Sequence, residues 1–224
     1  KERQSIFNKI EKDSNYRVKQ TIQKWRDALN YIEGSLNITD PLYQIIRELE
    51  LDAHIQSTIL LRKSRVTQLP FNILYKNDKK EDSNLIEINQ IFNNQWFNQF
   101  IGYALDYVYE GYVAIEIETI NSDKTLTVNK LPFNYLRPKY GKFVVNKNES
   151  YEKGIDLINN DYVIEVYDHR NDLGIYSKVA PLFMWSKNCH VAWSQYTERF
   201  GMPIIQYSTP KENGEEKRRI NEVL

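Results

Sequence analysis

The sequence predicts an α+β fold in which long helices flank a β-rich middle section. Three observations lead to this prediction. Apolar residues recur every three or four positions before residue 110, as on the buried face of a helix. Between residues 112 and 169 the pattern changes to short runs in which polar and apolar residues alternate, as in strands with one buried face. Helical spacing then returns from residue 177 to residue 200.

The composition limits the classes of protein to consider. The 224 residues carry 30 Lys and Arg against 30 Asp and Glu, so the chain lacks the broad positive field of a typical DNA-binding domain. A single cysteine, Cys189, excludes an internal disulfide framework. No apolar run approaches the roughly 20 residues that span a bilayer, and KERQSIFNKIEK lacks the layout of a signal peptide, so we expect a protein handled in the cytoplasm with no membrane partner.

The two ends of the chain suggest a fragment. The first residue is Lys rather than Met, and the last stretch, EEKRRINEVL, resembles a helix cut in mid-course. We therefore expect the chain to be a piece of a longer protein.

Residues 1–36 form the first predicted region, a basic helical segment. Its apolar residues from Val18 to Ile32 are spaced three or four apart, and Gly34 ends the run. One face of this helix is therefore expected to pack against another part of the protein.

Residues 37–111 form a second, helical region. Asp40 and Pro41 predict a helix start, because the aspartate accepts N–H groups of the first turn and the proline lies where its missing N–H costs nothing. The spacing that follows predicts one long helix ending before Pro70, and FNILY at residues 71–75 predicts a short strand.

A further long helix is predicted from about residue 84 to residue 109. Ser83 is a suitable N-terminal cap, and Gly111 ends the helix. The region then gives way to the strand-like pattern of the middle section.

Residues 112–172 form the β-rich section. YVAIEIETI alternates polar and apolar residues, NSDK supplies a turn and LTVNKL returns, which is typical of a β-hairpin. FNYLRP, KFVVN and DYVIEVYDH continue as short strands.

Residues 173–224 form the last region. It contains a long helix over residues 177–200, a corner at Gly201 and Pro203, a strand at IIQY and the start of a truncated helix.

The motifs of common enzymes are missing from the sequence. The three histidines lie in different elements, no Cys-x-x-Cys pair exists, and the glycines are too scattered for a phosphate-binding loop. No Gly-x-Ser-x-Gly motif is present, and Cys189 and His190 are adjacent on a helix, where their side chains point in different directions. We therefore expect no catalytic residue, no metal and no cofactor.

The acidic pair Glu116 and Glu118 leaves an enzymatic alternative open. Residues two apart on a strand share a face, so with Asp106 of the preceding helix these carboxylates are candidates for the metal site of a nuclease. The lysine that usually follows in nucleases is missing at the expected distance. We favour the simpler interpretation, a solvated polar face of a half-buried strand.

Three stretches of the sequence together resemble the portal proteins of Mu-like tailed phages over roughly residues 40 to 210. They are HIQSTILLRKSRVTQLPFNI, FIGYALDYVYEGYVAIEIE and APLFMWSKNCHVAWSQYTERFGMPIIQY. The third stretch is the most specific. The first two would be weak evidence alone, because a glycine between a helix and a strand is common. The positions that match the family pattern are Arg62, Val66, Gly111, Glu116, Ile117, Trp185, Lys187, Trp193, Glu198, Phe200, Gly201 and Pro203.

The resemblance implies a structural protein without catalytic residues. Portal proteins of this kind form a ring, commonly of about twelve copies, at one vertex of the capsid. Double-stranded DNA passes through the ring without sequence specificity, and terminase, head-completion, tail adaptor and capsid proteins bind to it. The resemblance thus implies a location in the virion, after assembly in the host cytoplasm.

The resemblance also suggests roles for the regions. Residues 37–111 would form a wing-like part, residues 112–172 the clip and the helix within residues 173–224 the stem. We expect the part of a portal that forms the crown to lie outside this piece of the protein. Gly201 and Pro203 would turn the chain sharply out of the helix.

Three cations of the last region, Lys178, Lys187 and Arg199, are candidates to face DNA in the channel. Surface ion pairs are an equally good interpretation for each of them. Trp185 and Trp193 are eight residues apart, near one face of the helix, and are expected in the core or at a subunit interface. Beside the portal and the nuclease, a protein-binding module of a mobile element remains a third hypothesis.

Overall fold

The computed structural model describes residues 21–74, 83–120 and 125–201. By its contacts the chain divides into two compact units, residues 1–185 and residues 186–224. Helices and two small antiparallel sheets make up the described part, which confirms the predicted α+β class. None of the helices in these described ranges combines the length and apolar character needed to cross a membrane.

The first unit is built around two three-stranded antiparallel sheets. The predicted hairpin is present as the β1–β2 pair, and β6 pairs with the other edge of β1; the four residues of the predicted turn, 121–124, lie outside the described residues. The strand orders are β2-β1-β6 and β3-β4-β5. The strands are β1 (Tyr112–Ile120), β2 (Leu126–Lys130), β3 (Leu136–Arg137), β4 (Lys142–Phe143), β5 (Ile155–Asp156) and β6 (Val163–Tyr167).

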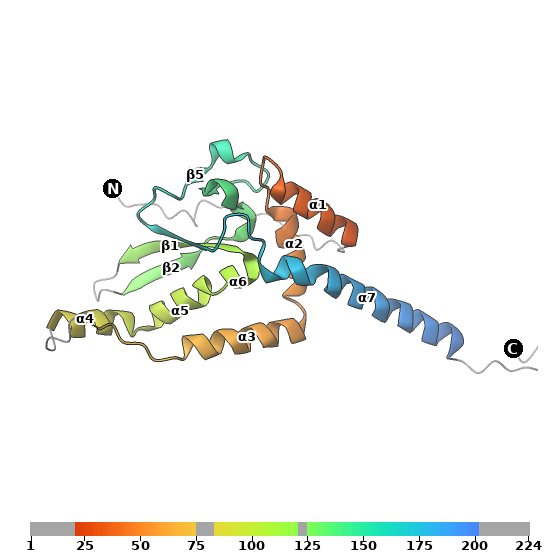
Figure 1. Cartoon of the computed structure of the whole chain (residues 1–224), viewed down its shortest axis with the longest axis horizontal. Coiled ribbons are helices and arrows are strands. Elements are labelled where there is room, and N and C mark those ends of the chain that lie inside the picture. The colour runs from red at the N-terminus through yellow and green to blue at the C-terminus, as the bar shows by residue number, and fades with distance from the viewer. Residues whose placement is uncertain (1–20, 75–82, 121–124, 202–224) are drawn as a thin grey trace, which may run out of the picture. The chain divides into compact units, whose positions relative to one another are not determined.

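The central strand β1 has both faces buried, one in each of two hydrophobic clusters. Tyr112 and Ala114 belong to the larger cluster, whereas Val113 and Ile115 belong to a smaller one around Trp96. Figure 1 shows α5 (Gln95–Ala104) along one side of β1 and β2, with α1 (Ile22–Glu33) and α2 (Asp40–Leu49) on the other side. Successive strand residues point to opposite faces, so nearly every side chain at the start of β1 is buried.

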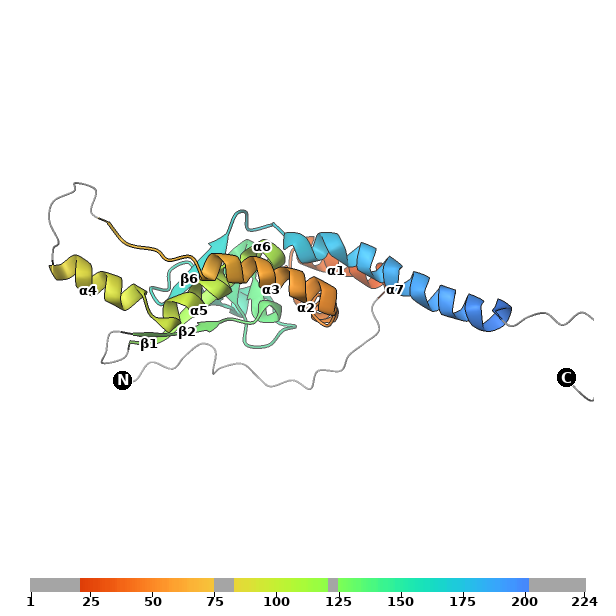
Figure 2. The same cartoon turned by 90° about the horizontal axis from the view of Figure 1, so that it is seen from below.

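The predicted helix from Asp40 to Pro70 is in fact two helices, so this prediction was wrong. The helix α2 ends at Leu49, and α3 (Ala53–Thr67) begins after Asp52. The Asp52 carboxylate accepts the N–H groups of His54 and Ile55, both at 3.0 Å, which caps a new helix and favours a break. Figure 2 shows α3 on the outside of the layer formed by α5, with which it is in contact.

The start of α2 was predicted correctly, but the capping role of Asp40 was not. The residue before the helix is Thr39, and no side chain caps the first turn. Instead, the Thr39 hydroxyl lies 2.7 Å from the Phe133 carbonyl and 2.9 Å from that of Leu136, and so ties the helix to the middle section.

The long helix predicted over residues 84–109 is also interrupted. It consists of α4 (Ser83–Phe92), α5 and a single turn, α6 (Tyr107–Glu110). Asn94 adopts an extended conformation before α5, with φ −121° and ψ 162°. Asparagine favours such positions because its short polar side chain competes for backbone hydrogen bonds. The predicted end at Gly111 is confirmed: this residue terminates α6 with φ 86°, in the left-handed region.

The strand predicted at residues 71–75 is absent from its described part, residues 71–74. The backbone of Ile73 pairs with a side chain instead. Its N–H donates to Asn89 Oδ1 at 2.8 Å, and its carbonyl accepts from Asn89 Nδ2 at 3.1 Å. The α4 amide thus satisfies the backbone groups that a neighbouring strand would otherwise bind.

The last helix, α7 (Gly174–Phe200), contains a proline without being interrupted. Pro181 has no N–H to offer to the carbonyl of Ser177 one turn earlier. The indole N–H of Trp25 donates to that carbonyl at 3.0 Å, so α1 supplies the hydrogen bond that the proline cannot make. This bond explains how a proline is accommodated inside the helix and ties α1 to α7.

The second unit is described only from Ser186 to Gly201. It consists of the second part of α7, whose described side chains are all exposed. The predicted helix end at Gly201 is confirmed, because Gly201 directly follows α7 and its N–H donates to the Thr197 carbonyl at 2.8 Å. Pro203 and the predicted strand at IIQY lie outside the described residues.

Candidate functional site

The three carboxylates considered for a nuclease do not form one site. Glu116 pairs in register with Asn129, and Asn129 Nδ2 donates to Glu118 Oε2 at 2.8 Å, so the two glutamates share a face as predicted. Asp106 binds Lys130, which pairs with Ile115 and therefore lies on the other face of the sheet. Among the described residues, no three His, Cys, Asp or Glu side chains are grouped as metal ligands would be.

The simpler interpretation of Glu116 was also incorrect. Its side chain is fully buried rather than part of a solvated face. Glu116 shares its face of β1 with Tyr112 and Ala114, which belong to the larger hydrophobic cluster, so this face is covered.

Partly buried charges gather around the buried Glu110, where α6 meets the sheet. Lys130 Nζ lies 2.6 Å from Glu110 Oε1 and 2.9 Å from Asp106 Oδ2, and Lys63 of α3 lies 2.6 Å from Asp106 Oδ1. The other oxygen of Glu110, Oε2, is buried without a hydrogen-bond partner. These ion pairs join α3, the α5–α6 turn and β2 into one charged cluster, which we call the Glu110 cluster.

Burial determines the protonation of the Glu110 cluster. It raises the pKa of Glu110 to about 7, against the opposing effect of Lys130. Burial would lower the pKa of Lys130, but Glu110 and Asp106 more than offset this, and its pKa lies above the ordinary value. Lys130 therefore stays charged at neutral pH, while Glu110 titrates there.

The family-pattern glycine Gly111 lies against a second glycine. A Cβ at Gly111 would lie 2.1 Å from the Asp172 carbonyl oxygen, and a Cβ at Gly174 would lie 2.2 Å from that of Tyr109. Gly174 also has a positive φ, 65°. Two backbones thus meet with no room for a side chain, where β1 begins on one side and α7 on the other. We call this contact the Gly111–Gly174 joint.

A buried arginine holds the second sheet to its loop. Arg137 is fully buried and donates to the carbonyls of Leu136 (2.9 Å), Lys147 (2.6 Å) and Glu149 (3.1 Å). Burial lowers its pKa to about 10. The guanidinium replaces backbone hydrogen bonds that this irregular segment cannot make for itself.

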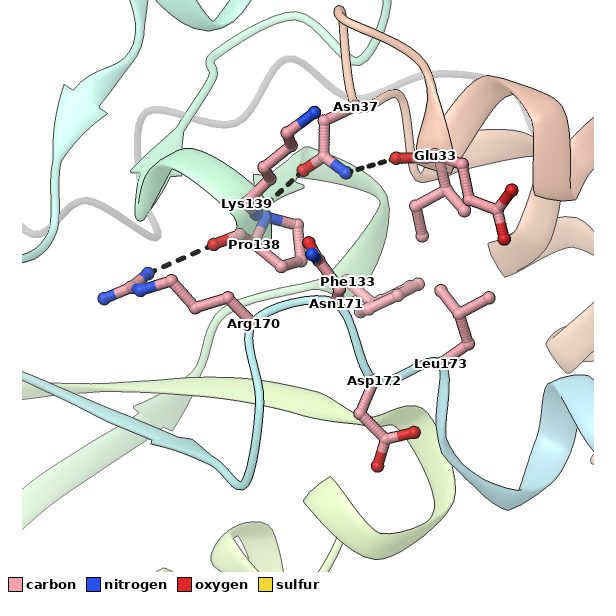
Figure 3. Close-up of a pocket in the computed structure, with 10 residues that line it drawn as sticks. Glu33, Asn37, Phe133, Pro138, Lys139, Arg170, Asn171, Asp172 and Leu173 are labelled. Carbon is pink, nitrogen blue, oxygen red and sulfur yellow. Dashed lines mark hydrogen bonds between the residues drawn. The ribbon is translucent and has the colours of Figure 1, made fainter.

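A cavity of about 290 Å³ lies beside the C-terminal end of α1 (Figure 3). Asn37 Nδ2 donates to the Ile32 carbonyl at 2.5 Å, and the Lys139 N–H donates to Asn37 Oδ1 at 3.1 Å. Arg170 reaches the Pro138 carbonyl at 3.1 Å and binds Glu165 through two hydrogen bonds, of 2.8 and 3.0 Å. The polar groups drawn with dashed lines are thus engaged with the protein itself.

The family-pattern residues of α7 lie on an exposed helix surface. Trp185 and Trp193 are exposed, so the expectation of a core position for them was incorrect, and an interface remains a prediction. Lys187 and Glu198 are also exposed.

The three candidate DNA-facing cations are not equivalent. Lys178 lies in the first unit with its Nζ 3.6 Å from Asp172 Oδ1, so it makes the surface ion pair that was the alternative interpretation. Lys187 is exposed on the second unit. The side chain of Arg199 is outside the described residues.

An apolar stripe runs along the second unit. Cys189, Trp193, Tyr196 and Phe200 are four, three and four residues apart and therefore share one side of the helix. Trp193 is 69% exposed and Phe200 62%, and the rings of Tyr196 and Phe200 lie 5.0 Å apart. Large exposed apolar side chains grouped in this way are typical of interaction surfaces. We call these four residues the α7 stripe.

Several of these features could not be found from motifs. Gly174, Arg137 and Asn89 act through contacts with segments far away in the sequence. A signal did exist for Trp25, since a proline inside a helix pattern leaves a carbonyl that some other donor has to satisfy.

One comparison with known proteins gives a match. The model of the family described as "Portal protein of Mu bacteriophage" matches residues 43–224. No curated protein matches the chain.

Proposed function

The chain belongs to the family of portal proteins of Mu bacteriophage, and we propose that it is a structural protomer of a portal ring. The ring would stand at one vertex of the capsid in the virion and pass double-stranded DNA without sequence specificity. It would be assembled in the host cytoplasm, with about twelve copies, and would bind terminase, head-completion, tail adaptor and capsid proteins. The match over residues 43–224 carries this proposal, and the family is generally structural and non-enzymatic.

The α7 stripe supports the ring part of this proposal. A closed ring needs head-to-tail contacts in which one surface of each protomer meets a different surface of its neighbour. The stripe offers three aromatic side chains, the residue type that contributes most to such interfaces. Within the proposal, the helix serves as the stem, residues 112–172 as the clip and residues 37–111 as the wing-like part.

The distribution of charge supports passage of DNA rather than tight binding. The chain has no net formal charge, and affinity for DNA rises with the number of phosphates that a protein neutralises. Lys178, Lys187 and Arg199 are the candidates to face the channel, and Lys178 Nζ lies 3.6 Å from Asp172 Oδ1 within the same unit.

The mass of the chain in solution tests the proposal. Native mass spectrometry and light scattering across a concentration series should show a species of about twelve 26.7 kDa copies, with ring-shaped class averages in electron microscopy. W193S/Y196S, on the stripe, should abolish the ring, because it removes two exposed aromatic anchors. V191S is the matched control, since Val191 is 56% exposed on the opposite side of the same helix. A monomer at every concentration would contradict ring formation and favour the protein-binding module.

A further inference from the structure

A groove in the first unit lies between α3 and the first turns of α7. It holds a cavity of about 260 Å³, bounded on one side by α3 and on the other by α7, with α6 contributing one side chain. Most of its surface is apolar, from Ile55, Ile59, Tyr109, Ile175, Tyr176 and Val179. The rings of Tyr109 and Tyr176 lie 5.9 Å apart.

The side of α3 that lines the groove continues beyond the cavity. Arg62 lies at the rim, and Val66 follows it four residues later on the same side of α3. Leu69 lies two residues past the end of the helix. Val66 is 44% exposed and Leu69 65%. From Ile55 to Val66 this strip is about 16 Å long at 1.5 Å per residue, enough for a partner helix of three turns.

The rim of the groove is cationic. From Ala53 to Thr67 the sequence contains Arg62, Lys63 and Arg65 and no Asp or Glu. Lys63 is paired with Asp106, whereas Arg62 and Arg65 are exposed and make no ion pair within the described part of the chain. An apolar floor with positive charges along one edge is complementary to apolar side chains bordered by carboxylates.

We propose that this groove is the docking site for an acidic amphipathic segment of another protein. Large apolar side chains of the segment fill the cavity, and its carboxylates pair with Arg62 and Arg65. A cavity of 260 Å³ is below the range of about 300–1,000 Å³ usual for small-molecule sites, so it suits single side chains inserted from a partner.

Two other occupants fit the groove less well. Nucleic acid would use the arginines but leave Val66 and Leu69 without apolar contacts. The α7 stripe of a second copy offers aromatic side chains but no carboxylate beside them, because Glu198 is five residues from Trp193 and lies on another side of its helix. The charge of the rim therefore favours a different protein. The proposal rests on the groove alone and does not require a ring.

Three synthetic helical peptides of fourteen residues, long enough to cover the strip, are the probes. The first has Leu and Glu on one face, the second has Lys in place of Glu, and the third has Gln in place of Leu. Fluorescence anisotropy with the full chain should show at least tenfold tighter binding of the Leu/Glu peptide than of either other peptide. R62E/R65E should weaken binding of the Leu/Glu peptide at least tenfold and strengthen binding of the Leu/Lys peptide. K24E/R26E, on α1, reverses the same number of charges and should leave all affinities unchanged.

A second pair of variants tests the cavity. Thr58 lines it from the exposed side of α3, so T58W should obstruct it and weaken the Leu/Glu peptide at least tenfold. Ser57 is also exposed on α3 but does not line the cavity, so S57W is the matched control. Circular dichroism and thermal unfolding of each variant verify that it is folded.

Four outcomes would overturn the proposal. Two concern the peptides: equal affinity for all three, or no effect of R62E/R65E on binding. The third is binding of a 20-base-pair DNA duplex, dependent on Arg62 and Arg65, with no peptide binding. The fourth is loss of self-association in R62E/R65E. The last would assign the groove to a second copy. A chain that forms rings but shows no peptide preference would disprove this inference and leave the portal proposal intact.

Discussion

Replacing Glu110 with Gln tests whether the buried carboxyl controls the pH dependence of stability. The pKa of Glu110 is raised from its ordinary 4.5 to about 7 in the folded protein. Between these values the folded protein keeps a proton that the unfolded chain releases, so the free energy of unfolding falls as the pH rises. Glu110 therefore does not oppose folding below about pH 4.5, and its destabilising effect is complete above about pH 7.

The size of the effect follows from the shift. At about 1.4 kcal/mol for each pKa unit, a rise from 4.5 to about 7 corresponds to about 3 kcal/mol. Gln has the shape of the protonated carboxyl and does not titrate. From pH 5 to pH 8 the free energy of unfolding of E110Q should therefore rise by about 2.5 kcal/mol relative to the natural protein, because about 1 kcal/mol of the effect is already present at pH 5. Comparing the free energy of unfolding of the two proteins at several pH values cancels any cost of the substitution that does not depend on pH. In E110Q, Lys130 still has Asp106 as an ion-pair partner.

The assay is denaturant unfolding at pH 5, 6, 7 and 8 and constant ionic strength, followed by tryptophan fluorescence. E152Q is the control, because Glu152 is exposed on the η4 turn (Tyr151–Lys153), and it should leave the pH profile unchanged. An E110Q profile parallel to that of the natural protein would refute the reasoning. It would mean that Lys130 keeps Glu110 ionised throughout this range.

Three further predictions concern the joints of the first unit. Gly174→Ala should destabilise the protein by more than about 2 kcal/mol in chemical denaturation, since left-handed backbone alone costs a non-glycine residue about 1–2 kcal/mol and the added Cβ also clashes. The control Gly102→Ala, with no atom within 4 Å of the new Cβ, should stabilise α5 by about 0.5–1 kcal/mol. Equal effects of the two substitutions would contradict the Gly111–Gly174 joint. Arg137→Met should cost about 3 kcal/mol and speed proteolysis between residues 147 and 149, because it leaves buried carbonyls unpaired; unchanged cleavage would show that the loop is held otherwise. Trp25→Phe should lower the free energy of unfolding by about 1 kcal/mol or more, and by much less in a Pro181→Ala background, where the helix supplies its own N–H. Additive effects in the double-mutant cycle would argue that the Trp25 hydrogen bond does not replace the one that Pro181 lacks.

Local patterns predicted the elements of this fold well where one residue decides the backbone. The glycine at position 111 ends α6. The alternation of residues 112–120 correctly predicted a strand, although both faces of its first half are buried and not one. The breaks in the two predicted long helices were missed because the spacing of apolar residues continues across each break. In each case a short polar residue, Asp52 or Asn94, begins a new helix, and the spacing alone does not show this.

Contacts between distant segments could not be predicted from one sequence. A run such as FNILY has the composition of a strand, but a strand needs a partner, and the Asn89 side chain occupies the backbone of Ile73 instead. The burial of Glu116 was missed for a similar reason, since it depends on distant segments that cover the face it shares with Tyr112 and Ala114. Alternation reports which residues share a face but does not report whether that face is covered.

The distribution of unpaired groups separates the parts of this molecule that support the fold from those available for assembly. In the first unit, most ionic groups of the Glu110 cluster and of the Arg137 guanidinium are bound within the protein. This costs the burial of charge and leaves Glu110 Oε2 and Arg137 Nε without a hydrogen-bond partner. The α7 stripe and the α3 side of the groove instead leave large apolar side chains in water, which costs free energy unless another molecule covers them. The stripe is aromatic without adjacent carboxylates, whereas the groove has a cationic rim. Two surfaces of such different chemistry would bind different partners, so a protomer could join its neighbours through the stripe and still present the groove to another protein.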